Sequence, residues 1–221
     1  MSLNAEYTFG SPGTEKGSID QVAKRLFDVS VATTALILLG PLLLMLAFAV
    51  LCLEGRPIIY RHRRLTVERK AFDCLKFRSM VADAESKLQH HLSQNPVAAS
   101  EWAESQKLSG DPRITRFGAF LRSSSLDELP QLINIIRGDM SLVGPRPIVA
   151  DELTKYGDHA DECLSVRPGL TGLWQVSGRS DCAYADRVRL DVDYVQNWSF
   201  SKDLVIFVKT FGVVLSRKGS A

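Results

Sequence analysis

The pattern of apolar and polar positions divides the chain into a long apolar segment near the N-terminus and a mixed remainder. From Val29 to Leu53, 25 successive residues carry no charge, and 20 of them are apolar. A run of about 18 or more such residues is typical of a membrane helix. Ahead of it, residues 20–28 predict an amphipathic helix that enters the membrane. Residues 1–18, which are polar and rich in Gly, Ser and Thr, predict a mobile tail.

Two features of the apolar run bear on its topology. Gly40 and Pro41 lie at its middle, and proline kinks or breaks a helix. Basic residues flank both ends, whereas positive charge marks the cytoplasmic side of a membrane segment. A re-entrant helix that turns back at Pro41 satisfies both features, because each arm would cross about one leaflet. A single kinked span with a basic far side is the alternative, and the pattern alone leaves both open.

The rest of the chain predicts a mostly helical α/β domain. Short strands are expected at residues 58–60 and 71–77, and a helical region over 80–108 is expected to break near Asn95 and Pro96. The Gly-rich tract at 167–182 predicts a loop that carries part of a site. Further helices are expected over residues 113–122, 127–138, 148–160, 184–196 and 201–216, the last of which is apolar on nearly all sides and therefore either buried or laid in the membrane interface.

Composition and charge narrow the class of protein. With 45% hydrophobic and 24% charged residues, collagen-like and wholly disordered classes are excluded, and a net charge of +2 does not favour a nucleic-acid binder. The four cysteines lack metal-ligand spacing. The charge is uneven, however. Residues 54–80 hold eight basic and three acidic side chains, a local charge of +5 that predicts contact with anionic lipid beside the membrane segment.

The strongest candidate for chemistry is the adjacent carboxylate pair Asp127 and Glu128. Pro130 follows closely, and because proline is tolerated only in the first turn of a helix, the sequence predicts a helix that starts at Asp127–Pro130. Asp127 could therefore be a capping residue, since aspartate accepts hydrogen bonds from the free N–H groups of a helix start. Alternatively, the pair could hold a metal ion or attack phosphorus.

Nearby cations favour the second interpretation. Arg122 lies five residues before Asp127, and Arg146 lies between two prolines that restrict its backbone. Arginine matches phosphate oxygens with two parallel hydrogen bonds. Carboxylates among several cations suit a diphosphate substrate bound with Mg²⁺, although each arginine alone could be a surface charge. Further cations in tracts of mixed Gly, Phe and Ser are Lys76, Arg78 and Arg179.

Six ordered tracts resemble those of the monotopic bacterial sugar transferases, which load a sugar phosphate onto a polyprenol-phosphate carrier. The resemblance covers about residues 21–216 and is greatest to the short members that start exopolysaccharide repeat units with galactose or glucose 1-phosphate. The matching tracts are KRLFD at 24–28, KFRSM at 76–80, DPRIT at 111–115, SLDELPQL at 125–132, GDMSLVGPRP at 138–147 and RPGLTGLWQVSGR at 167–179.

The resemblance implies a reaction and a set of site residues. Asp127 would be the nucleophile that attacks the β-phosphorus of a UDP-sugar and releases UMP, and the sugar phosphate would then pass to polyprenol (undecaprenyl) phosphate. Glu128 and Mg²⁺ would organise the diphosphate, with Asp127 and Glu128 as the metal ligands. Arg122 and Arg146 match arginines of the family that bind phosphate. Further contacts to nucleotide or acceptor are expected from Lys76, Arg78, Gln175 and Arg179.

The resemblance also implies how the chain is organised. It predicts a small monotopic membrane domain with interfacial amphipathic helices and a re-entrant helix broken at Pro41, where Gly40 replaces the usual serine. The expected parts are a tail at 1–18, a membrane-embedded segment at 19–56 and a catalytic domain at 57–221 on the cytoplasmic face of a bacterial inner membrane. UDP-sugar, polyprenol phosphate and membrane lipid are the expected partners, and the C-terminal helix could support a homodimer.

A different class of function stays open at this point. The tail, the apolar anchor and the basic strip would equally suit a non-catalytic membrane-bound module that assembles or regulates polysaccharide synthesis. Nothing in the sequence selects between a galactose and a glucose donor, because the two sugars differ at one hydroxyl stereocentre.

Overall fold

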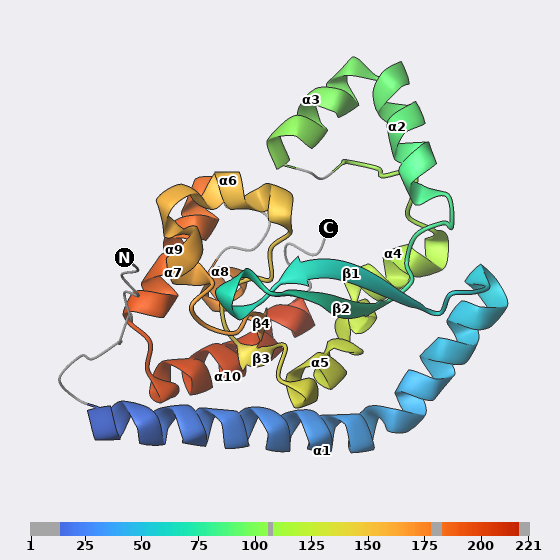
Figure 1. Ribbon diagram of the computed structural model, residues 1–221. Helices are drawn as coiled ribbons and strands as arrows, with labels where there is room; N and C mark the ends of the chain where they lie inside the picture. Colours follow the sequence, from blue (N-terminus) through green and yellow to red (C-terminus); the bar gives the residue numbers. More distant parts are fainter. Residues whose placement is uncertain (1–13, 106–107, 178–182, 217–221) are drawn as a thin grey trace, which may run out of the picture.

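The computed structural model describes residues 14–105, 108–177 and 183–216, and it confirms a mostly helical α/β protein. The long helix α1 (Thr14–Glu54) runs along one side of a body built from two small sheets and several shorter helices (Figure 1). The strands are β1 (Ile59–Leu65), β2 (Ala71–Phe77), β3 (Ser141–Val143) and β4 (Gly169–Thr171). The other helices are α2 (Ala84–Gln94), α3 (Pro96–Ser105), α4 (Arg116–Ser123), α5 (Gln131–Arg137), α6 (Leu153–Tyr156), α7 (Ala160–Cys163), α8 (Leu173–Ser177), α9 (Tyr184–Gln196) and α10 (Phe200–Ser216).

Helix α1 is continuous through Pro41, yet it bends between a longer first part and a shorter second part (Figure 1). We attribute the bend to Pro41, the proline in its interior, because proline removes a backbone donor and its ring clashes with the preceding turn. By length and composition α1 could cross a membrane. Apolar side chains such as Leu38 and Leu44 are 73% and 74% exposed, so they are not covered by the body of the protein.

The helix also begins earlier than expected. It starts at Thr14, so the last five residues of the segment predicted to be a tail are helical.

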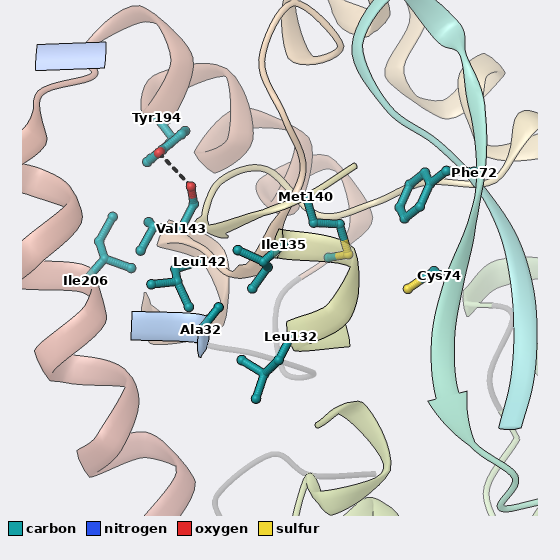
Figure 2. Packing of buried hydrophobic residues seen from close by; sticks show 10 residues of the cluster. All are labelled: Ala32, Phe72, Cys74, Leu132, Ile135, Met140, Leu142, Val143, Tyr194 and Ile206. Carbon is teal, nitrogen blue, oxygen red and sulfur yellow. Dashed lines mark hydrogen bonds between the residues drawn. The ribbon is translucent and has the colours of Figure 1, made fainter. Parts of the chain in front are cut away.

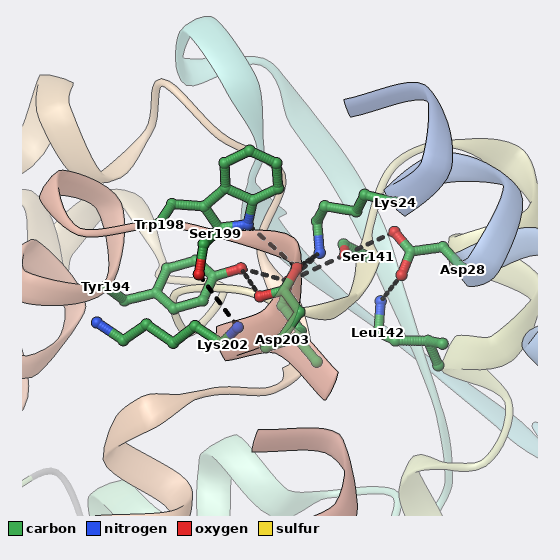
Figure 3. Close-up of polar contacts among 10 residues, drawn as sticks. Lys24, Asp28, Ser141, Leu142, Tyr194, Trp198, Ser199, Lys202 and Asp203 are labelled. Carbon is green, nitrogen blue, oxygen red and sulfur yellow. Dashed lines mark hydrogen bonds and ion pairs between the residues drawn. The ribbon is translucent and has the colours of Figure 1, made fainter. Parts of the chain in front are cut away.

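An ion pair attaches the first part of α1 to α10 (Figure 3). The Lys24 ammonium lies 2.5 Å from the Asp203 carboxylate and also donates to the Val143 carbonyl at 3.0 Å. Asp203 is 1% exposed and accepts two further hydrogen bonds, from the Tyr194 hydroxyl at 2.7 Å and the Trp198 indole N–H at 3.1 Å. Because each charge has a partner and several hydrogen bonds, the pair is stable despite its burial.

The next polar residues of α1 hold β3 and the helix α5 that precedes it. Asp28 accepts a hydrogen bond from the Ser141 hydroxyl at 2.7 Å and another from the Leu142 N–H at 3.2 Å. Arg25 donates to the Ile135 carbonyl at 2.7 Å, in the last turn of α5, where carbonyl groups lack helical partners. Gly138 caps the end of α5 with a φ of 95°, a left-handed conformation that glycine adopts readily, and this agrees with the expected helix end at residue 138.

Strands β1 and β2 form an antiparallel ribbon in which His62 lies opposite Cys74 and Tyr60 lies opposite Lys76. Opposed side chains share one face of a sheet, so His62 and Lys76 lie on the same face. The strands predicted at 58–60 and 71–77 are confirmed, although the first extends further, to Leu65.

Asn134 connects α5 to the ribbon. Its side-chain oxygen accepts from the Leu75 N–H at 3.0 Å, and its amide donates to the Asp73 carbonyl at 2.8 Å. One side chain thus satisfies two backbone groups of an otherwise unpaired strand edge.

A buried apolar cluster joins α1 to this arrangement (Figure 2). Its members come from α1, β2, α5, β3, α9 and α10, so segments far apart in the sequence meet in one core. Helix α10 packs on α1 through edge-to-face contacts of Phe27 with Phe200 and Phe207. The outer side of α10 stays apolar and exposed at Leu204, Val205, Val208 and Phe211.

The basic strip at 54–80 is not a uniform lipid-facing surface. Arg61 and Arg63 are exposed beside Asp73, but Arg64 and Lys76 turn inward to Glu152 and Glu128 respectively. The alternation of a β-strand separates them, since successive residues point to opposite faces. The predicted contact with anionic lipid is therefore wrong for Arg64 and Lys76, whose charges are paired inside the protein.

Candidate functional site

The carboxylate pair lies on a short turn rather than at the start of an α-helix. Asp127 and Glu128 belong to a 3₁₀ turn, Leu126–Glu128, and α5 begins only at Gln131. Ser125 introduces the turn with a φ of 57°, a left-handed conformation that non-glycine residues seldom adopt. The predicted helix start at Asp127 is thus wrong. A capping role for Asp127 is not supported either, because Pro130 occupies the N-cap position of α5 and no side-chain hydrogen bond caps this helix.

Glu128 is paired with a cation from the neighbouring ribbon. The Lys76 ammonium on β2 lies 2.6 Å from the Glu128 carboxylate. Burial opposes ionisation of Glu128, but Lys76 and Arg146 outweigh it and lower the pKa of Glu128. Glu128 is therefore the member of the pair that stays ionised down to lower pH.

Asp127 has the opposite environment. It is 7% exposed, and burial together with the charge of Glu128 raises the pKa of Asp127 to about 6, while Lys76 and Arg122 act in the other direction. Two adjacent carboxylates with pKa values moved apart are typical of sites that carry out acid–base or nucleophilic chemistry.

Arg146 approaches the pair from the loop that follows β3. This loop is held tightly: the Gly144 N–H donates to the Thr171 carbonyl at 2.9 Å, and a Cβ added at Gly144 would lie 2.5 Å from the Arg167 carbonyl oxygen. Only glycine fits such a close backbone approach. Arg64 fixes the far side of the loop by donating to the Pro147 carbonyl at 2.8 Å.

The structure brings Asp127, Glu128, Lys76, Arg122 and Arg146 together but places other predicted residues elsewhere. The Arg78 guanidinium is buried and donates to the Arg56 carbonyl at 2.5 Å, just after α1. Gln175 lies on α8 and donates to the Leu170 carbonyl at 3.2 Å. Gly40 and Pro41 are in the interior of α1. Arg179 lies outside the described residues.

Several residues around the site are not among those predicted from the sequence. His62 is half-buried, and burial together with Arg64, Lys76 and Arg146 lowers its pKa to about 3, so it is neutral at physiological pH. Strand alternation on β1 could have revealed that His62 and Arg64 face inward. Arg187 and Trp174 could not have been found in this way, because α8 and α9 meet the site only through tertiary packing.

A Mg²⁺ ion with a diphosphate would fit the carboxylate pair. Among the described residues there is no cluster of three or more potential metal-ligating side chains. Mg²⁺, however, is commonly held by one or two carboxylates, with waters and substrate phosphates completing its shell. Asp127 and Glu128 supply that number of protein ligands, and the cations around them suit the phosphates.

Comparison with known proteins establishes the family. Residues 19–217 match the bacterial sugar transferase family, and the chain belongs to it.

Among its relatives, the exopolysaccharide production protein ExoY of Sinorhizobium fredii is 52% identical over 202 residues, which cover 91% of this chain and 89% of that protein. An undecaprenyl-phosphate galactose phosphotransferase of Salmonella typhimurium is 50% identical over 197 residues, or 89% of this chain and 41% of that longer protein. A UDP-glucose:undecaprenyl-phosphate glucose-1-phosphate transferase of Xanthomonas campestris is 38% identical over 215 residues, which cover 93% of this chain and 41% of that longer protein.

Proposed function

We propose that this protein transfers a hexose 1-phosphate from a UDP-sugar to undecaprenyl phosphate and releases UMP, as the first membrane step in building an exopolysaccharide repeat unit. The observation that carries the proposal is the buried Asp127 beside Glu128, surrounded by Lys76, Arg122 and Arg146. The relatives named for sugar-phosphate transfer to undecaprenyl phosphate support it.

In the first half-reaction, an ionised oxygen of Asp127 attacks the β-phosphorus of the donor. A bond forms between this oxygen and phosphorus, the bond from phosphorus to the bridging oxygen breaks, and the electron pair leaves on UMP. Arg122 and Arg146 bind the phosphate oxygens, on which negative charge is concentrated. The product is a sugar-phosphoryl ester of Asp127.

In the second half-reaction, a phosphate oxygen of undecaprenyl phosphate attacks the same phosphorus. The bond to Asp127 breaks, which regenerates the carboxylate and yields undecaprenyl-diphospho-sugar. A covalent intermediate lets one site serve a cytosolic donor and a lipid acceptor in turn.

Two residues would hold Mg²⁺ in this scheme, Asp127 and Glu128. When bound, the ion would supply positive charge next to the diphosphate. Lys76 keeps Glu128 ionised and fixes its carboxylate at 2.6 Å. Glu128 is thus a negatively charged metal ligand whose charge is already paired with a cation in the folded protein.

The location we propose is the cytoplasmic face of the bacterial inner membrane. The acceptor phosphate lies at the headgroup plane, and the nucleotide sugar is in the cytosol. A helix α1 that re-enters at Pro41, together with the exposed apolar side of α10, would keep the site at this plane. Membership in a transferase family speaks against the alternative of a non-catalytic module.

The test is to incubate the purified protein with individual UDP-sugars, Mg²⁺ and undecaprenyl phosphate, and to measure UMP release. With donor alone, intact mass spectrometry should show a hexose-phosphate adduct on the wild-type chain and none on Asp127→Asn. Asp158→Asn, a change at an exposed aspartate, is the control and should form the adduct normally. An adduct on Asp127→Asn would exclude Asp127 as the nucleophile, and the donor that reacts fastest identifies the sugar.

A further inference from the structure

A buried arginine, Arg187 on α9, lies over the same aromatic ring as the half-buried Arg146. The Arg187 guanidinium is 4.5 Å from the centre of the Trp174 ring, and the Arg146 guanidinium is 5.8 Å from the same ring. Arg187 also lies 5.3 Å from the ring of Tyr184. Two cations thus meet at one indole, which attracts each of them through the negative face of its π-system.

No carboxylate of the described residues lies in direct ion-pair contact with either of these two arginines. Over the described ranges, the Nε of Arg187 also has no hydrogen-bond partner, although the residue is only 7% exposed. Burial and the charge of Arg146 lower the pKa of Arg187.

Two carboxylates interact electrostatically with the arginine pair, and each has another hydrogen-bond partner. Glu152 accepts from Arg64 at 3.3 Å. One oxygen of Asp191 accepts from the Tyr156 hydroxyl at 2.8 Å, whereas its Oδ1 has no hydrogen-bond partner among the described residues. Burial raises the pKa of Asp191 to about 7 although both arginines act in the opposite direction, so Asp191 offsets only part of the charge of the arginine pair. The two guanidinium groups repel each other, and an anion that binds between them stabilises both.

Helix α8, which carries Trp174, holds two further polar groups without hydrogen-bond partners in the described part of the chain. The Trp174 indole N–H and the Gln175 side-chain oxygen are buried and have no hydrogen-bond partner. Arg146 connects this region to the carboxylate pair, because its charge also lowers the pKa of Glu128. The arginine pair is therefore next to the place where the proposed reaction occurs.

The chemistry of the proposed function, on which this inference rests, indicates which anion binds. UMP, which leaves in the first half-reaction, and undecaprenyl phosphate, which enters in the second, are both phosphate monoesters. Each must occupy the position opposite Asp127 at the reacting phosphorus. We propose that Arg187, together with Arg146, binds the phosphate monoester group of the departing nucleotide and then that of the arriving lipid.

The test compares Arg187→Gln with Arg189→Gln, a matched change on the same helix. Arg189 is 77% exposed and pairs with Asp186 at 3.1 Å. Two quantities are measured with Mg²⁺ present: the equilibrium affinity for UMP, and the KM for undecaprenyl phosphate. Arg187→Gln should lower the affinity for UMP about tenfold and raise the KM for undecaprenyl phosphate about tenfold, the effect typical of losing a charged hydrogen-bond donor. Arg189→Gln should change neither quantity.

A second variant guards against loss of the fold. Arg187→Lys keeps the charge but not the planar, bidentate group, so it should fold and show a smaller loss for both ligands. Unchanged binding of UMP in the folded variants, or a loss for only one of the two ligands, would overturn the shared phosphate site.

Failure of this inference can be distinguished from failure of the proposed function. If the wild-type protein releases UMP through the Asp127 adduct while Arg187 variants behave normally, only the role of Arg187 is wrong. If the wild-type protein neither binds UMP nor forms the adduct, the proposed function itself fails.

Discussion

At the residue scale, Asp127 and Glu128 are neighbours in sequence with different electrostatic environments. Lys76 contacts Glu128 directly, whereas Asp127 is buried beside that negative charge. A single 3₁₀ turn is enough to separate them, because successive side chains on it point in different directions. The pair thus contains one carboxylate whose ionisation is favoured by its surroundings and one whose ionisation is opposed by them.

This difference leads to a prediction about stability. Because burial and Glu128 raise the pKa of Asp127 from 3.8 to about 6, ionised Asp127 destabilises the folded state. The folded protein binds its proton more tightly than the unfolded chain, so stability falls as pH rises from about 4 to about 6 and stays lower above that. Asp127→Asn removes this loss and should be more stable than wild type at pH 8 by about 1–3 kcal/mol.

The measurement is thermal or chemical unfolding in EDTA at pH 8 and at pH 4. The advantage of Asp127→Asn should be present at pH 8 and disappear at pH 4. Asp158→Asn is again the control, because Asp158 is exposed. An equal effect of Asp127→Asn at both pH values would show that the substitution acts through packing rather than charge.

At the element scale, the polar residues at the start of α1 determine how the membrane helix meets the catalytic body. Lys24 and Asp28 contact the backbone of β3, and the loop that carries Arg146 follows directly. The position of α1 and the position of Arg146 therefore depend on the same short strand.

We expect Lys24→Met to destabilise the protein by about 3 kcal/mol, because it leaves the buried Asp203 carboxylate without its cation. Lys202→Met is the control: Lys202 pairs with the more exposed Asp193 at 3.1 Å, and loss of such a pair costs less than about 1 kcal/mol. Unfolding in detergent measures both. Equal losses for the two variants would show that the Lys24 pair contributes no more than a surface pair.

At the scale of the whole molecule, the bend in α1 decides between a re-entrant and a spanning topology. The helix is long enough for either arrangement, and its apolar side chains are largely exposed. If the bend returns the chain to the cytoplasmic side, both ends of α1 lie on one face of the membrane.

The prediction is tested by labelling single cysteines at Thr14 and Lys70 in a background that lacks Cys52, with an impermeant reagent applied to inverted and to right-side-out vesicles. Both positions should react only from the cytoplasmic face. Pro41→Ala restores a backbone donor and should straighten the helix, so that some of the molecules label at Thr14 from the opposite face. Opposite labelling in the wild-type protein would exclude the re-entrant topology, and the background without added cysteine controls for the native thiols.

The sequence by itself determined the elements that depend on local pattern. The uncharged run predicts α1, the short stretch at residues 71–77 predicts β2, and the helix expected over 127–138 ends where α5 ends, because these features depend on neighbouring residues. The tracts around Asp127 and Arg146 also indicated the family before any contact was known.

Only the tertiary structure decided how these pieces act together. In the structure, Lys76 forms an ion pair with Glu128, and Arg78 donates to the Arg56 carbonyl just after α1. Arg187 and Arg146 lie over the same Trp174 ring. The structure also showed that Asp127 lies in a 3₁₀ turn before the helix, where burial and not capping determines its ionisation. The physical reason is that burial and electrostatic coupling depend on distances between residues far apart in the chain, whereas propensity and periodicity report only on residues a few positions apart.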